Sequence, residues 1–174
     1  MKIYQILTAI TLLSLSALAS AQPSLLSRYT VINNGSEVQD NRTGLIWQRC
    51  TQGMVVTSDL SNCEGTPSLV LHEDALRIAT ELSANGWRLP NLKELSSIVN
   101  RASNSTTIDT VVFPSNPQGN LDFFWSSTPD TTTGGRVLTI SFNTDKVGVN
   151  SLLRSDNNSG EVFTGLVRLV RTLN

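Results

Sequence analysis

The feature that most constrains the fold is the ten-residue stretch Gly86–Leu95, in which one helix must end and another must begin. Gly86 follows an asparagine and predicts a helix end, because glycine readily adopts the left-handed backbone conformation. Pro90 excludes the residue before it from the helical conformation, so the chain between the two helices is expected to be extended. Asn91 is a good helix cap, and Glu94 can return a hydrogen bond to it in a capping box.

The side chains of this extended crossing alternate in character. Trp87 and Leu89 are apolar and flank Arg88. Because successive side chains of an extended segment point to opposite faces, Trp87 and Leu89 are expected to face the core and Arg88 to face solvent. A purely structural junction and a binding role for Arg88 or Lys93 both stay open.

The N-terminal residues have the pattern of an export signal. Lys2 supplies a positive start, an apolar run follows, and Ala19-Ser20-Ala21 is a cleavage motif. We therefore expect a signal peptide at 1–21, a mobile lead-in at 22–28 and one domain at 29–174. The apolar run is too short to span a bilayer, so we expect no membrane span. The predicted location is the periplasm, or the cell surface after secretion.

The charge of the chain disfavours a nucleic-acid partner. Lys2 is the one charged residue of the signal, so the 13 basic and 14 acidic residues of the chain leave 12 and 14 after cleavage, a net charge of −2. Binding to nucleic acid needs a strong basic field, and this balance does not provide one.

The two cysteines, Cys50 and Cys63, predict one structural disulfide. An even cysteine count in an exported chain favours a bridge. A zinc site is disfavoured, because it needs three or four ligands and the chain has a single histidine, His72.

The hydrophobic pattern predicts an α+β domain in which two helices lie between two groups of strands. The helices are expected at 72–83 and 92–101, and short strands at 28–32, 36–39, 45–49, 121–128, 136–142, 146–150 and 166–172. The loop between the cysteines shows no period of its own. The segment 108–119 is expected to be irregular, with Val111, Val112 and Phe113 anchored in the core.

Four ordered motifs carry a family resemblance. They are Asp40–Trp47 with Cys50 and Cys63, Trp87–Leu95, Phe124–Thr128 and Val167–Arg171. Together they resemble the family of the Legionella collagen-like protein (Lcl) C-terminal domain, over residues from about Tyr29 to Arg171. The resemblance implies a C-type-lectin-like fold, shared with formylglycine-generating enzymes, in which two helices flank short antiparallel sheets and the first and last strands pair.

The resemblance also implies structural roles for the motif residues. These are Trp47, Trp87, Leu89, Pro90, Glu94, Trp125 and Arg168. Arg168 and Arg171 lie on opposite faces of the last expected strand, and one of them is expected to point inward and pair with an acid such as Asp40. For the three tryptophans, core packing is favoured over a role as platforms for sugar stacking.

Catalysis and metal binding find little support in the residues. His72 is expected to be an exposed or capping-turn residue, and no nucleophile-elbow motif is present. The cysteines lie in the wrong part of the chain for formylglycine-generating chemistry, so we predict a protein that is not an enzyme. Asp122 and the loop Asp156–Ser159 are candidate oxygen ligands for calcium, the one cofactor that we consider.

The predicted function is therefore binding. The founding adhesin of the family binds sulfated glycosaminoglycans, which implies adhesin-like recognition of a glycan. The basic residues that could pair with sulfate or carboxylate groups are Arg88, Lys93, Arg101, Arg136 and Arg154. The alternative is an accessory subunit of an envelope assembly that acts through protein contacts. The sequence defines no oligomeric state.

Overall fold

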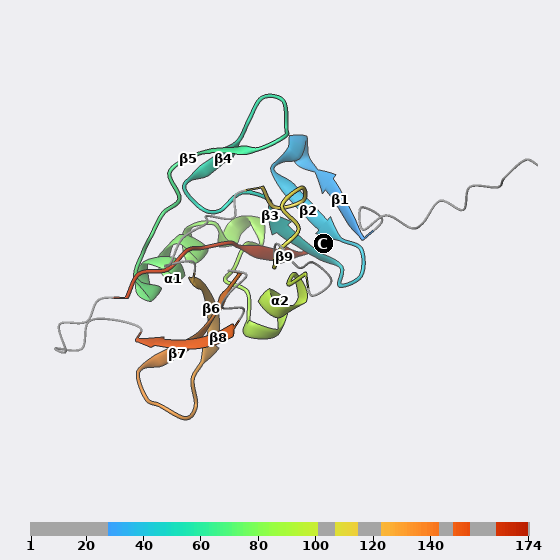
Figure 1. The fold of residues 1–174 in the computed structure, drawn as a ribbon. Coiled ribbons are helices and arrows are strands. Elements are labelled where there is room, and N and C mark those ends of the chain that lie inside the picture. Colours follow the sequence, from blue (N-terminus) through green and yellow to red (C-terminus); the bar gives the residue numbers. More distant parts are fainter. Residues whose placement is uncertain (1–27, 101–106, 115–122, 143–147, 154–162, 174) are drawn as a thin grey trace, which may run out of the picture.

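The computed structural model describes residues 28–100, 107–114, 123–142, 148–153 and 163–173 (Figure 1). Within these residues the chain is α+β, with small antiparallel sheets and two α-helices, which confirms the predicted class. The expected signal peptide at 1–21 lies outside the described residues, as does the expected lead-in apart from its last residue, Arg28.

The largest sheet has four antiparallel strands in the order β1-β2-β3-β9. They are β1 (Tyr29–Ile32), β2 (Glu37–Asp40), β3 (Leu45–Gln48) and β9 (Val170–Thr172). The expectation that the first and last strands pair is wrong, because β9 pairs with β3. The reason is the meander: short turns join β1, β2 and β3 in sequence, so β1 forms one outer edge and the free edge of β3 accepts the returning chain.

A two-stranded hairpin lies beside this sheet and carries the disulfide. It consists of β4 (Met54–Val56) and β5 (Cys63–Gly65), which the sequence did not predict. Each strand has three residues, which is too short to show a period of two. The predicted Cys50–Cys63 disulfide is confirmed, with a Cα–Cα distance of 5.8 Å.

The third sheet contains β6 (Phe123–Pro129), β7 (Arg136–Ser141) and β8 (Gly148–Leu153) in that order. These antiparallel strands correspond to the expected strands at 121–128, 136–142 and 146–150. The last of them continues three residues further than expected, because the register with β7 runs from Ser141 opposite Gly148 to Arg136 opposite Leu153.

The two helices flank the extended crossing as predicted. α1 (His72–Glu81) is followed by the 3-10 turn η3 (Ser83–Asn85), which ends at Gly86 in the left-handed conformation with φ of 79°. α2 (Leu92–Ser97) begins with the predicted capping box between Asn91 and Glu94.

α2 is shorter than the expected range of 92–101. Ile98 caps its end and is buried. Beyond it the chain turns extended, because Val99 forms a β-bridge with Ile108 and the Asn100 N–H donates to the carbonyl of Thr107. Tertiary pairing therefore ends a helix that the local pattern would allow to continue.

The core is divided between two clusters of buried side chains. One surrounds Trp47 and Phe124 and includes Leu95 of α2, and the other surrounds Trp125 and Trp87 and includes Ala75 of α1. Each helix therefore covers a different part of the sheets.

One expectation about burial is wrong, and the expectation for His72 is met only in that it lies in the first turn of α1. Val111 is 68% exposed, although Val112 and Phe113 are buried as expected. His72 is only 5% exposed: its Nε2 lies 3.1 Å from the carbonyl oxygen of Ser126, and its ring packs edge-on against Trp125. The first turn of α1 packs on β6. This packing buries His72, although a polar residue would be expected at the surface.

Arg168 is buried, but it does not pair with Asp40. Its guanidinium donates to the carbonyl oxygens of Gln48 and Arg49, and it lies over the rings of Phe113 and Phe124. The ion pair expected of this strand is instead made by Arg171, which pairs with Glu37 at 2.8 Å. Asp40 pairs with Arg28 at 2.6 Å, because Arg28 sits at the start of β1 beside the end of β2.

Candidate functional site

A groove of about 360 Å³ lies between α1 and the extended crossing before α2. We call it the Trp87 groove. The α1 side contributes Leu76, Ala79, Thr80 and Ser83, the crossing contributes Trp87, Arg88, Leu89 and Asn91, and β6 contributes Ser127. The groove therefore collects residues from three separate parts of the chain.

Backbone pairing fixes the crossing that forms one wall. The N–H of Arg88 donates to the carbonyl of Val170 and the N–H of Val170 donates to the carbonyl of Arg88, each at 3.0 Å. The Ser127 N–H donates to the carbonyl of Pro90 at 2.8 Å. Because the crossing is held extended on both sides, Trp87 and Leu89 turn inward and are buried, while Arg88 turns outward.

The three tryptophans do not offer open stacking faces. Trp47 and Trp125 are fully buried. Trp87 is 9% exposed, and the guanidinium of Arg171 lies over its ring at 5.2 Å from the centroid. A sugar ring would therefore meet the other lining residues of the groove before an indole face.

Arg88 is the best-defined donor in the groove. Its Nη1 and Nη2 donate to the two carboxylate oxygens of Glu94 at 2.8 and 2.6 Å, and Nη1 also donates to the carbonyl of Leu89 at 3.3 Å. Nε–H and the second hydrogen of Nη2 have no acceptor in the described part of the chain. The side chain is 44% exposed, so these two donors form an accessible N–H fork.

The Arg88–Glu94 pair holds its charges firmly. The hydrogen bonds that Arg88 donates to the Glu94 carboxylate are the main cause that raises the pKa of Arg88. Burial alone would raise the pKa of Glu94, but the hydrogen bonds from Arg88 and from the Asn91 N–H outweigh it and keep that pKa below its usual value. The guanidinium is thus both charged and fixed in position at neutral pH.

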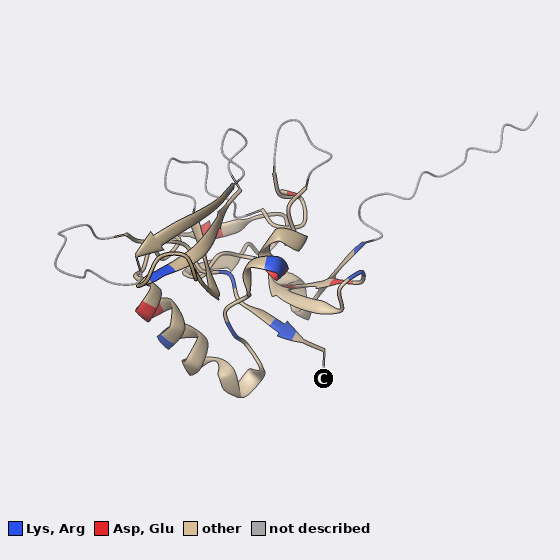
Figure 2. Cartoon of the chain, turned by 90° about the horizontal axis from the view of Figure 1, so that it is seen from below, with Lys and Arg blue, Asp and Glu red and all other residues tan. Residues whose placement is uncertain are grey.

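The structure does not gather the predicted basic residues into one site. Arg88 lines the Trp87 groove and Lys93 is exposed on α2. Arg136 begins β7, where its Nε donates to the Ser151 hydroxyl at 3.1 Å. Arg101 and Arg154 lie outside the described residues. Figure 2 shows Lys and Arg spread over several elements.

Most of the described arginines already have partners. Four of them form ion pairs with acids: Arg28 with Asp40, Arg77 with Asp74 and Glu81, Arg88 with Glu94, and Arg171 with Glu37. Arg49 and Arg168 are buried and donate to backbone carbonyls. The described surface therefore lacks a dense basic patch.

Comparison with protein families gives one match. The model of the Lcl C-terminal domain family matches residues 36–171, well over half of the chain. The chain belongs to this family. Neither the curated proteins nor the solved structures contain a match.

The groove of this Lcl C-terminal domain includes residues that sequence reasoning did not single out. Thr80 and Ser83 line it from the α1 side, and their hydroxyls donate to the carbonyls of Leu76 and Thr80. Ser127 lies inside the motif Phe124–Thr128, so the sequence could have indicated it as a candidate site residue. No sequence feature marked Thr80 or Ser83 as a site residue, because hydroxyl side chains are common on helix surfaces.

The described residues of the Lcl C-terminal domain show no metal centre. No group of three or more His, Cys, Asp or Glu side chains in the described ranges could hold a metal ion. The calcium candidates Asp122 and Asp156–Ser159 lie outside those ranges. None of the described helices combines the length and apolar character needed to cross a membrane.

Proposed function

We propose that this Lcl C-terminal domain is an exported, non-catalytic binding module that recognises an acidic glycan, of the sulfated glycosaminoglycan type, in the Trp87 groove. The observation that carries the proposal is the accessible N–H fork of Arg88 in a groove of suitable size. Family membership supports the proposal, and the pattern at 1–21 together with the disulfide supports export.

The fork suits a sulfate or carboxylate group. A guanidinium presents parallel N–H donors whose spacing matches two oxygens of such a group. Glu94 occupies one edge of the Arg88 guanidinium and prevents it from rotating, so the ordering cost of binding is reduced. Leu76, Ala79 and Leu89 supply an apolar wall for the C–H face of a sugar.

We infer further that the α+β arrangement is C-type-lectin-like. Support comes from the family and from the return of β9, the last described strand, to the sheet formed by β1, β2 and β3. In such an arrangement the loops and crossings between sheets and helices are free to carry a binding site. The Trp87 groove lies on such a crossing.

The test is binding of the mature chain, residues 22–174, to immobilised sulfated and neutral glycans across a salt series, with and without calcium. We expect binding to the sulfated glycans that weakens with salt. Arg88→Lys keeps the charge and removes the fork, and we expect it to weaken binding about tenfold. Arg42→Lys is the matched control, because Arg42 is exposed in the turn after β2 and does not line the groove.

Two results would count against this proposal. Equal loss of binding in the Arg88→Lys and Arg42→Lys variants would indicate that the glycan contacts guanidinium groups anywhere on the surface and not the groove in particular. Binding that Arg88→Lys leaves unchanged would place the glycan elsewhere on the domain.

A second candidate function is an accessory subunit that contacts an envelope protein. It is favoured by Leu60 and Val111, two exposed apolar residues whose carbonyl oxygens both accept hydrogen bonds from Arg49. Arg49 thus brings two apolar side chains from distant segments to one place on the surface. If no glycan binds, a photo-crosslinker at Val111, compared with one at the exposed Val149 of β8, would test this alternative.

A further inference from the structure

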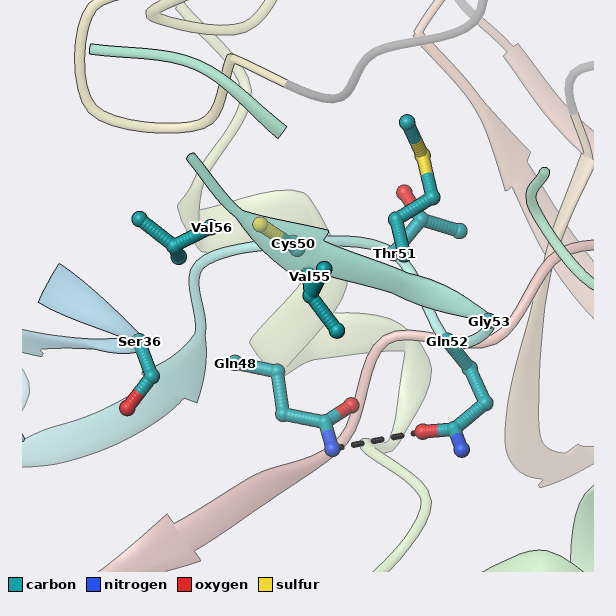
Figure 3. Close-up of a pocket in the computed structure, with 9 residues that line it drawn as sticks. Ser36, Gln48, Cys50, Thr51, Gln52, Gly53, Val55 and Val56 are labelled. Atoms are coloured by element: carbon teal, nitrogen blue, oxygen red, sulfur yellow. Dashed lines mark hydrogen bonds between the residues drawn. The ribbon is translucent and has the colours of Figure 1, made fainter. Parts of the chain in front are cut away.

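A second hollow, of about 400 Å³, lies beside the disulfide where β3 leads towards the β4–β5 hairpin. Figure 3 shows it with Gln48 and Gln52 directed towards each other. We call it the Gln pocket. All the described residues that line it are uncharged, which distinguishes it from the Trp87 groove with its Arg88–Glu94 pair.

Hydrogen bonds orient the two carboxamides of the Gln pocket. The Leu169 N–H donates to Oε1 of Gln48 at 3.1 Å. This hydrogen bond identifies the oxygen of the Gln48 carboxamide, so the NH₂ group of Gln48 faces Gln52. Gln48 Nε2 in turn donates to Oε1 of Gln52 at 3.3 Å. The relay leaves the Gln52 NH₂ group as a donor without an acceptor in the described part of the chain.

The backbone under these side chains is held rigidly. The Gln52 N–H donates to the carbonyl of Val167, and the carbonyl of Gln52 accepts from the Ser68 N–H. Gly53 has φ of +91°, and a Cβ there would lie 2.5 Å from the Ser68 hydroxyl, so glycine is required. The disulfide joins Cys50, two residues before Gln52, to Cys63 at the start of β5. The pocket is therefore formed in advance of any ligand.

Apolar side chains form the opposite side of the Gln pocket. Val55 is 62% exposed although it lies on a strand, and Val56 lines the pocket beside it. The pocket thus combines aligned amide donors with an aliphatic surface.

We propose that the Gln pocket binds a neutral pyranose sugar, as a second site separate from the Trp87 groove. A pyranose has an edge of hydroxyl oxygens, which accept hydrogen bonds, and a face of C–H groups, which packs on aliphatic side chains. The Gln52 NH₂ group would donate to the hydroxyl edge of the sugar, and Val55 would pack against its C–H face. A charged sugar gains nothing here, because no described lining residue carries a charge. The pocket volume is at the lower end of the range for small-ligand sites, which suits a single ring.

The test is a titration of the disulfide-bonded mature chain, residues 22–174, with N-acetylglucosamine and with glucose, followed through the side-chain amide signals of Gln48 and Gln52 by NMR. We expect both pairs of signals to shift at millimolar sugar. Gln52→Glu keeps the acceptor for Gln48 and removes the donors, and we expect it to weaken binding about tenfold. Gln39→Glu on β2 is the matched control, because it adds the same charge outside the pocket.

The result separates this site from the function proposed above. We expect Arg88→Lys to leave the shifts unchanged, so failure at one site leaves the other standing. An absence of shifts in Gln48 and Gln52, or an affinity that Gln52→Glu leaves unchanged when it is followed through Gln48, would overturn the proposal. An equal response to N-methylacetamide would overturn the sugar assignment in favour of a peptide ligand.

Discussion

At the scale of single residues, most of the described arginines form hydrogen bonds or ion pairs with other groups of the domain. Arg49 donates to the carbonyls of Gly35, Leu60, Val111 and Val112, and so ties three segments together. Burial lowers the pKa of Arg168 to about 9, which still leaves it charged at neutral pH. A count of basic residues in the sequence therefore overstates the positive charge that a ligand can reach.

The Arg28–Asp40 pair makes stability depend on pH. Burial alone would raise the pKa of Asp40, but hydrogen bonds from the Arg28 side chain and the Arg42 N–H outweigh it, so the pKa is lowered in the folded state. A carboxyl with a lowered folded pKa stabilises the fold above its unfolded pKa of about 3.9. That contribution is lost as the pH falls through the folded pKa.

We therefore predict that Asp40→Asn lowers the free energy of unfolding by about 1–3 kcal/mol at pH 7. The difference from wild type should shrink as the pH falls below about 4, because Asp40 is protonated first in the unfolded chain and then, below the lowered folded pKa, in the folded chain as well. Urea unfolding across this pH range measures it. In an Arg28→Met background the change at pH 7 should be smaller, because the ion pair that it removes is already absent. A difference that is constant with pH in the wild-type background would contradict the assignment.

At the scale of elements, the β4–β5 hairpin depends on its disulfide. Its two strands have three residues each, and the loop between them is closed by local hydrogen bonds centred on Thr57 and Asp59, such as that from Thr57 N–H to the carbonyl of Asn62. A hairpin of this size is at best marginally stable without further support. The bridge to Cys50 anchors it to the end of β3.

We predict that the Cys50→Ala/Cys63→Ala double variant melts several degrees below wild type. In the chain-entropy model a bridge of this loop length contributes about 3 kcal/mol. Calorimetry measures the shift, and titration of the wild-type chain should show no reactive thiol. Equal melting temperatures would mean that the hairpin is held by its packing alone.

Elements whose signals are local could be predicted, and those set by tertiary contacts could not. Gly86, Pro90 and the Asn91–Glu94 capping box act within a few residues, and the structure contains all the features that they predicted. The end of α2 depends instead on the bridge from Val99 to Ile108. The pairing of β9 with β3, which joins residues more than a hundred positions apart, has no local signature.

The candidate site was only partly predictable for the same reason. The alternation of Trp87, Arg88 and Leu89 correctly placed Arg88 outward. The sequence could not show that Glu94 would hold one edge of its guanidinium, or that α1 would supply the opposite wall. The Gln pocket depends on a hydrogen bond from Leu169 to Gln48, and nothing in the spacing of those residues indicates it.

At the scale of the whole molecule, the C-terminal segment joins the separate parts of the fold. Val167, Leu169 and Val170 are fully buried, and Val170 pairs both with β3 and with the crossing at Arg88. Arg168 extends from the same segment to the carbonyls after β3. One short segment thus contacts the four-stranded sheet, the disulfide region and the wall of the Trp87 groove.

We predict that a mature chain ending at Leu166 does not fold cooperatively. It would lack β9 and Arg168, and the carbonyls of Gln48, Arg49 and Arg88 would lose their donors at the centre of the molecule. Circular dichroism during heating, with amide-signal dispersion by NMR, measures this. A chain ending at Thr172 is the control, because it removes only Leu173, which is exposed, and Asn174. We expect the control to melt as wild type does. A sharp transition in the chain ending at Leu166 would show that the sheets and helices form a stable core before the C-terminal segment joins them, and that the segment is then a late addition to the fold.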